Sequence, residues 1–131
     1  MGRTLVLAIV VALASPAVSA REIRHDAVPD IFWGTWAPGT DACKEKDKPI
    51  VLAAKAYAGL AGTCDIDYVT EIPGRNGPIY SARMRCSSSG AQAKTIANLI
   101  IRPEDGGQIS AGPTFENLVA YRRCPADGAK Q

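Results

Sequence analysis

Four cysteines are the residues of this 131-residue chain with the clearest chemical potential. They are separated by 20, 21 and 37 intervening residues, and their positions are Cys43, Cys64, Cys86 and Cys124. Protein zinc sites usually take two ligands from a short Cys-x-x-Cys pair, which this spacing does not contain. We therefore expect two disulfide bonds and no bound metal, although four cysteines allow three connectivities.

No combination of side chains in the sequence predicts catalysis. A hydrolytic triad needs a base beside its nucleophile, and the single histidine, His25, lies in an expected N-terminal lead-in. Asp65 and Asp67 resemble paired catalytic carboxylates on one face of a strand, but basic residues expected opposite them would keep both ionised. The serine-rich stretch 87–90 lacks the Gly-Lys ending of a phosphate loop. We expect neither an enzyme nor a cofactor.

The first 20 residues have the three-part pattern of an export signal. Arg3 is followed by the apolar run 5–14, a Ser-Pro break at 15–16 and a small-residue cleavage site that ends at Ala20. This run is too short for a membrane-spanning helix, which needs about 20 apolar residues. We therefore predict a cleaved signal peptide at 1–20, a periplasmic or secreted protein, and no membrane insertion after cleavage.

Charge and length limit the remaining possibilities. The 15 basic and 13 acidic residues nearly balance and form no basic stripe, which argues against nucleic-acid binding. The length fits one domain, and small exported domains often compensate for a modest core with disulfides. We expect a monomer with a mobile lead-in at 21–30, one β-barrel domain at 31–125 and a C-terminal tail at 126–131.

One predicted hairpin bears on the cysteine pairing. The segments 64–72 and 79–86 alternate in polarity and flank a turn-rich stretch at 73–78. If opposing residue numbers sum to 150, cysteine faces cysteine and acids face bases, in the pairs Cys64–Cys86, Asp65–Arg85, Ile66–Met84, Asp67–Arg83, Tyr68–Ala82 and Thr70–Tyr80. This register favours Cys64–Cys86 and leaves Cys43–Cys124. The pairing of Cys43 with Cys64 and of Cys86 with Cys124 stays open.

Short β-prone segments broken by Gly and Pro indicate the fold class. Besides the hairpin, strands are expected at 31–37, 95–101, around Ile109 and at 115–124. The segment 50–58 is ambiguous, because its first three residues favour a strand and its alanines favour a helix. The pattern predicts an all-β fold, a small antiparallel up-and-down β-barrel of about six to eight strands that is stapled by two disulfides.

Two short motifs carry a family resemblance. Gly34-Thr35-Trp36 in the first expected strand, together with Arg122 and Arg123 in the last, resembles the signature of lipocalin-like barrels. The resemblance implies that Trp36 stacks against one of the two arginines and closes one end of the barrel.

In size, export and a Gly-x-Trp followed by a cysteine, the chain is also similar to small periplasmic inhibitors of secreted bacterial metalloproteases. That resemblance implies a protruding N-terminal segment that enters the protease cleft, here Arg21, Glu22 and Ile23. This chain departs from that family in having four cysteines instead of two and a more charged lead-in.

These observations together favour an exported, non-enzymatic protein of the cell envelope that binds a protein partner. An inhibitor of a secreted protease or another hydrolase is one version of this function. A carrier of a small apolar ligand is an alternative, although Trp36, Tyr68, Tyr80 and Met84 are expected to fill the interior of so small a barrel. A structural envelope protein without a discrete site is a further alternative.

Overall fold

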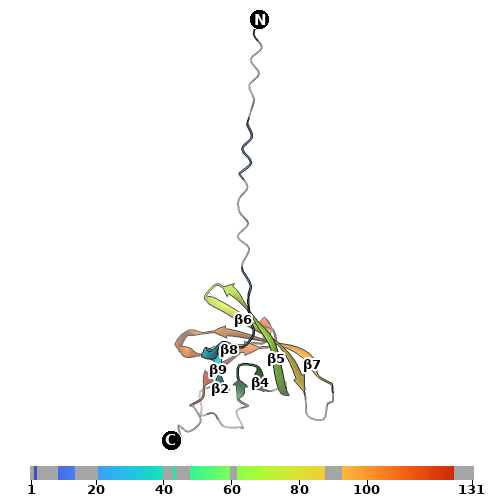
Figure 1. Cartoon of the computed structure of the whole chain (residues 1–131). Helices are drawn as coiled ribbons and strands as arrows, with labels where there is room; N and C mark the ends of the chain where they lie inside the picture. The colour runs from blue at the N-terminus through green and yellow to red at the C-terminus, as the bar shows by residue number, and fades with distance from the viewer. Residues whose placement is uncertain are drawn as a thin grey trace.

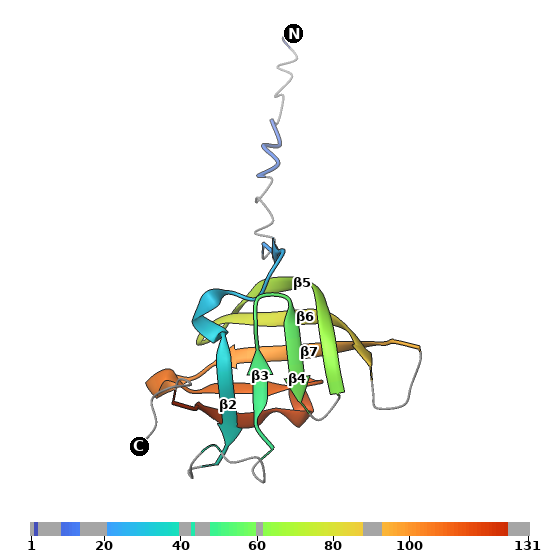
Figure 2. The same ribbon diagram turned by 60° about the horizontal axis from the view of Figure 1, so that its bottom comes forward.

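The computed structural model describes residues 2, 9–13, 21–39, 43, 48–59, 62–87 and 93–125, so most of the predicted signal peptide and the tail at 126–131 lie outside it. Within these residues, eight antiparallel strands close into a barrel, in which each strand pairs with the next and the last pairs with the first (Figures 1 and 2). The strands are β2 (Gly34–Pro38), β3 (Ile50–Leu52), β4 (Ala56–Gly59), β5 (Gly62–Gly74), β6 (Gly77–Ser87), β7 (Thr95–Pro103), β8 (Ile109–Gly112) and β9 (Val119–Arg123). The predicted all-β up-and-down barrel is confirmed.

A further strand, β1 (Ile23–His25), lies outside the closed barrel and pairs with β5. The lead-in expected at 21–30 thus contributes a strand to the sheet. The Val28 N–H donates to the Ala54 carbonyl at 2.9 Å, and the Val28 side chain is buried. The physical reason is a mismatch in strand length: β4 covers only the first part of β5, so β1 supplies hydrogen-bond partners farther along the same edge.

Strands β5 and β6 form the predicted hairpin, but its register changes part-way along. Cys64, Asp65 and Ile66 lie opposite Cys86, Arg85 and Met84, as the sequence predicts. A bulge between Ile66 and Tyr68 then places Tyr68 opposite Arg83, so the expected pairs Asp67–Arg83, Tyr68–Ala82 and Thr70–Tyr80 are wrong.

The cause of this change is the turn at the tip of the hairpin. Two residues, Arg75 and Asn76, connect the paired glycines Gly74 and Gly77, so opposing numbers sum to one more than expected near the turn. The extra residue in β5 absorbs the difference and reverses the alternation beyond it. Val69 consequently points into the core, and Tyr68 lines the outer face of the sheet.

A 3-10 helix, η1 (Asp30–Phe32), replaces the first part of the strand expected at 31–37. It follows Pro29, and its turn is closed by the Phe32 N–H, which donates to the Pro29 carbonyl at 3.0 Å. The Phe32 ring packs edge-on against Tyr80 with 5.0 Å between centroids, so η1 covers one end of the core. Two other 3-10 turns, η3 (Asp105–Gly107) and η4 (Phe115–Asn117), precede β8 and β9.

The ambiguous segment 50–58 forms two strands joined by a tight turn. The Ala53 N–H donates to the Ala56 carbonyl at 2.9 Å, which reverses the chain between β3 and β4. Tyr57 is buried and lies opposite Leu52 on one side and Cys64 on the other. Burial of this phenol inside the barrel outweighs the helical propensity of the neighbouring alanines.

Side chains from every strand of the barrel fill its interior. Burial is the largest cause of the raised pKa of the phenols of Tyr57, Tyr80 and Tyr121, because it disfavours the ionised form. The largest fully buried side chains are Trp36, Ile50, Leu52, Met84, Ile101, Ile109, Val28, Val69 and Cys64. An eight-stranded barrel has an interior just wide enough for such side chains.

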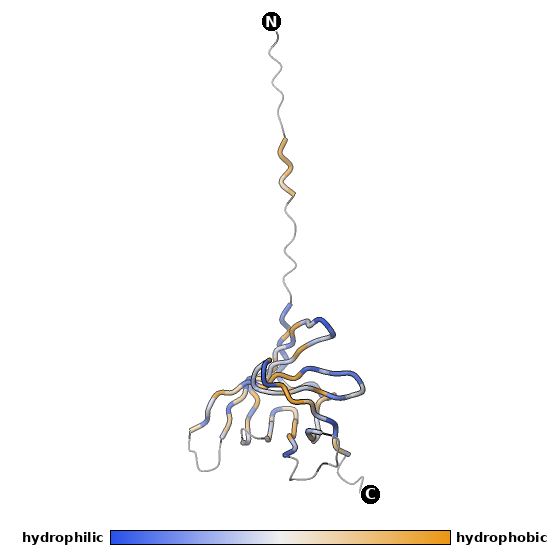
Figure 3. The backbone as a smooth tube through the Cα atoms, turned by 180° about the vertical axis from the view of Figure 1, so that it is seen from behind, coloured by the Kyte–Doolittle hydropathy of each residue, from blue (hydrophilic) through white to orange (hydrophobic). Residues whose placement is uncertain are grey.

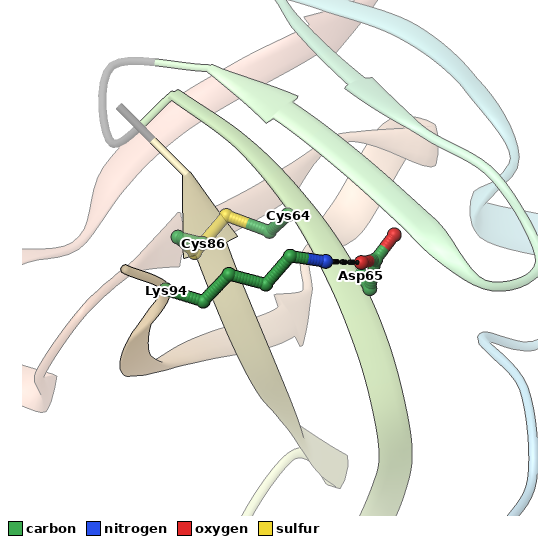
Figure 4. The surroundings of a disulfide bond; sticks show 4 residues. All are labelled: Cys64, Asp65, Cys86 and Lys94. Carbon is green, nitrogen blue, oxygen red and sulfur yellow. Dashed lines mark hydrogen bonds and ion pairs between the residues drawn. A yellow bond between two sulfur atoms is a disulfide. The ribbon is translucent and has the colours of Figure 1, made fainter. Parts of the chain in front are cut away.

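Both disulfides favoured by the hairpin register are present. Cys64 and Cys86 bridge β5 and β6 with 4.0 Å between their Cα atoms, and Figure 4 shows this bridge beside the Asp65–Lys94 ion pair. Cys43 and Cys124 have Cα atoms 5.6 Å apart and connect the loop after β2 to the end of β9. The alternative of Cys43 with Cys64 is excluded.

We predict that the longer loop closed by Cys43–Cys124 makes this bridge the more stabilising of the two. Replacing both cysteines by alanine should lower the free energy of unfolding by about 4.5 kcal/mol, against about 3.4 kcal/mol for the Cys64–Cys86 pair. Urea denaturation of the two double variants measures the difference. A larger loss for the Cys64–Cys86 variant would contradict this ranking.

Candidate functional site

Trp36 and Arg123 close one end of the barrel, where the first strand meets the last. They lie opposite each other in the β2–β9 ladder, and the Arg123 guanidinium carbon is 4.3 Å from the centroid of the Trp36 ring. Arg123 also donates from Nη1 to the Trp33 carbonyl at 2.7 Å and from Nη2 to the Ile31 carbonyl. The indole Nε1 of Trp36 donates to the Phe32 carbonyl at 2.9 Å. One arginine and one tryptophan therefore fasten η1 across the barrel end.

The sequence left open which arginine makes this contact, and the structure assigns it to Arg123. Arg122 lies opposite Ala37 and, because side chains alternate along a strand, it points to the other face of β9. Gly34 belongs to the same closure. Its φ angle is +132°, and a Cβ atom at this position would lie 3.0 Å from Arg123 Nη1. The Gly-x-Trp motif thus leaves room for the guanidinium.

We predict that Arg123→Ala destabilises the barrel by about 2 kcal/mol, because the stacking on Trp36 and both hydrogen bonds to η1 are lost together. The measurement is urea denaturation. Arg83→Ala is the matched control, since Arg83 is an exposed arginine on the barrel wall, and its loss should change the free energy by less than about 0.5 kcal/mol. Equal effects of the two substitutions would contradict the closing role of Arg123.

The N-terminal residues assigned to a protruding arm are divided between the two faces of the hairpin. Arg21 and Ile23 line a pocket of about 430 Å³ on one face, whereas Glu22 lines a pocket on the other. Ile23 is in β1, opposite Glu71. Only Arg21 and Glu22 would precede β1 if the chain is cleaved after Ala20. Ile23 is therefore part of the sheet, and an arm of this length is too short to enter a deep cleft.

His25 takes part in a polar contact that the sequence did not predict. Its Nε2 lies 2.9 Å from Glu71 Oε1, and its ring centroid lies 6.3 Å from that of Tyr80. Burial, and then the nearby Glu71 carboxylate, raise the pKa of Tyr80. Among the described residues, no hydroxyl or thiol nucleophile is hydrogen-bonded to His25. The pair fixes β1 to β5, and no local sequence pattern indicates it because the partners are 46 residues apart.

Asp65 and Asp67 are both engaged in ion pairs on the outer face of the hairpin. Asp67 accepts from Arg85 Nε at 2.9 Å, and Asp65 pairs with Lys94, a residue beyond the predicted hairpin (Figure 4). The hydrogen bond and charge of Lys94, with a smaller contribution from Arg85, hold the pKa of Asp65 below its ordinary value. A carboxyl group held ionised in this way is unsuited to act as the acid of a glycosidase.

We predict that Lys94→Met raises the pKa of Asp65 towards its ordinary value, because the hydrogen bond and the positive charge are both removed. The lowered pKa of Asp65 stabilises the folded protein at pH values above the pKa of this carboxyl in the unfolded chain. This stabilisation is lost as the pH falls through the pKa of Asp65 in the folded protein. Carboxyl-carbon NMR titration of the native protein and of the variant measures the change. An unchanged pKa in Lys94→Met would contradict the assigned cause.

Two adjoining pockets form what we call the hairpin groove, on the outer face of the β5–β6 hairpin and β7. The first has a volume of about 400 Å³ and extends between the hairpin tip and the end of β7. The second has a volume of about 270 Å³ and continues along the wall of the sheet. Ile79 and Phe115 line both. The other lining residues are Arg75, Asn76, Gly77, Arg102, Pro103 and Glu104 in the first, and Glu22, Tyr68, Thr70, Ile72, Ser81, Arg83, Asn98 and Ile100 in the second.

The divergence of two hairpins explains the first of these pockets. The β6–β7 ladder ends at Tyr80 opposite Ile101, although both strands continue beyond this pair. Figure 3 shows the β5–β6 and β7–β8 hairpins spreading apart, with polar residues near their tips. If the same register continued for two more pairs, Pro78 would lie opposite Pro103. Proline has no N–H with which to extend a ladder. Sequence reasoning missed the groove because it depends on where this pairing stops.

In outline the closed eight-stranded barrel is lipocalin-like. Comparisons with protein-family models, with curated proteins and with solved structures give no match to this chain. In the described part of the chain, no three His, Cys, Asp or Glu side chains gather to hold a metal ion. None of the helices described there is long and apolar enough to cross a membrane.

Proposed function

We propose that this protein is an exported, non-enzymatic binding protein of the cell envelope and that its ligand is another protein. The observation that carries the proposal is the location of the available surface. Core side chains such as Trp36 and Met84 occupy the barrel interior, while the hairpin groove lies on the outer wall. A ligand bound in this groove contacts a broad, partly apolar surface, as a protein partner requires.

The two disulfides support the exported location, because such bridges form and persist in oxidising compartments. The pattern of the first 20 residues agrees with it. We propose a monomer, because the barrel closes its own sheet and leaves no strand of the described ring unpaired.

An inhibitor of a secreted hydrolase is one form of this proposal. The docking of Ile23 in β1 changes how such an inhibitor would act, because the hairpin and its groove would contact the enzyme in place of a free N-terminal arm. A carrier of a small apolar ligand has less support, since the three pockets at the hairpin are lined by none of the largest buried side chains.

The experiment is capture of a partner with the mature protein, residues 21–131, from envelope and extracellular fractions of its source organism. We expect one protein to be retained at micromolar concentration and to rebind as a purified 1:1 complex in calorimetry. Ser81→Trp, which fills the groove, should abolish retention. Thr63→Trp is the control, because Thr63 is exposed on the outer face of β5 but does not line the groove.

Retention that is equal in the two tryptophan variants would place the partner elsewhere on the surface. Recovery of no protein partner at micromolar concentration, or copurification of a small apolar molecule from the folded protein, would refute the proposal.

A further inference from the structure

The hairpin groove has a floor of outward-facing apolar side chains. Ile72 and Phe115 are 37% and 54% exposed, and Ile79 lies half-buried between the two pockets. Farther down the same wall, the outward positions of the hairpin carry charged residues, such as Asp65 and Arg85. Ile72, Ile79 and Phe115 thus form an apolar patch at the projecting end of the hairpin, and this patch is hydrated until a ligand covers it.

Positive charge without an acidic partner surrounds this floor. Among the described residues, no ion pair or hydrogen bond engages the guanidinium of Arg75 or Arg83, one in each pocket. A third guanidinium, that of Arg24, lies 4.0 Å from the centroid of the Tyr68 ring, which also lines the groove. Arginine side chains placed in this way favour carboxylates.

The acidic residues of the groove offset this charge only in part. Glu104 accepts from Arg102 Nε at 2.7 Å, and this hydrogen bond is the largest cause of the lowered pKa of Glu104. That pair is neutral as a unit. Glu22 is the one other carboxylate that lines either pocket in the described chain. The two unpaired guanidiniums of the lining, together with that of Arg24 on Tyr68, therefore outnumber its one unpaired carboxylate.

The backbone around the groove disfavours the addition of a strand. Pro78 and Pro103 stand at the two edges that diverge, and neither has an N–H to donate to an incoming chain. A ligand must then be recognised by its side chains. Strand β6 rises about 3.3 Å per residue, so Gly77 and Arg83 are roughly 20 Å apart, the span of about six extended residues.

We propose that the hairpin groove binds an extended acidic segment of the partner protein, in which an aliphatic or aromatic side chain lies between carboxylates. The apolar side chain packs on Ile79 and Phe115, and the flanking carboxylates pair with Arg75 and Arg83. This inference rests on the proposed function and assigns a chemistry to the ligand.

The test uses two synthetic hexapeptides with blocked ends, Glu-Asp-Leu-Phe-Asp-Glu and Lys-Lys-Leu-Phe-Lys-Lys, titrated into the folded mature protein. We expect the acidic peptide to bind and to shift the NMR signals of Ile72, Ile79 and Arg83, whereas the basic peptide should not bind. Affinity should fall as salt is added, because the contacts with the arginines are exposed to solvent.

Two matched pairs of variants separate the contributions of charge and apolar contact. Arg83→Glu should weaken binding of the acidic peptide at least tenfold, whereas Lys48→Glu, at an exposed cation outside the groove, should leave it unchanged. Ile72→Ala should weaken it several-fold, whereas Val51→Ala should not, although Val51 is equally an outward β-branched residue and is 42% exposed. Circular dichroism and thermal unfolding establish that each variant is folded.

Equal binding of the two peptides, or shifts confined to another face, would overturn the inference. So would binding to vesicles of anionic phospholipid with no binding of the acidic peptide, which would assign the groove to a membrane surface. If the acidic peptide fails to bind at millimolar concentration while a captured partner is still lost in Ser81→Trp, the assigned chemistry is wrong and the proposed function stands.

Discussion

The fold depends on the closure of one sheet upon itself, and the ring closes at the seam between β2 and β9. Both strands have five residues, and three residue pairs join them. The seam is reinforced by the Cys43–Cys124 bridge, by the hydrogen bond from the Cys124 N–H to the Thr35 carbonyl at 2.8 Å, and by Arg123 on Trp36. Without this seam both strands would present an unpaired edge, and the core between them would be open to water.

Unequal strand lengths produce the candidate site from the same sheet. Strands β5 and β6 have 13 and 11 residues, whereas β3 and β4 have three and four, so the long hairpin extends beyond the ring that its neighbours complete. Strand β1 covers part of the exposed edge of β5. On the other side, the divergence of β6 from β7 leaves the groove. The β5–β6 hairpin therefore projects, and exposes the hairpin groove, because β4 and β7 pair with only part of its two strands.

Sequence reasoning succeeded where local pattern decides the structure. Alternation around Cys64 and Cys86 was enough to place the hairpin and to favour the cysteine pairing that the structure has, although it left a second connectivity open. The Gly-x-Trp motif pointed to the contact of Trp36 with an arginine of the last strand. These features depend on neighbouring residues, or on a motif whose partner lies in an identifiable strand.

The features that sequence reasoning missed depend on single-residue shifts and on distant pairing. The residue types around Tyr68 do not reveal the bulge before it. The bulge can be inferred only once the two-residue length of the turn is known. The docking of β1 and the His25–Glu71 contact join segments 46 residues apart, for which alternation gives no guide. Burial of Tyr57 converted an alanine-rich stretch into a strand, because tertiary packing outweighs a small intrinsic preference.

The position of the seam also affects how the chain acquires its structure during synthesis. Strand β2 is synthesised early, but one of its two edges pairs with β9, the last strand of the barrel. Trp36 can contact Arg123 only after the 87 positions that separate them have been synthesised. Contacts of such long range slow folding, and until they form the nascent chain carries an open edge that invites association with other chains. The ring can close only after β9 has been synthesised, so a polypeptide that stops before this strand cannot complete the barrel.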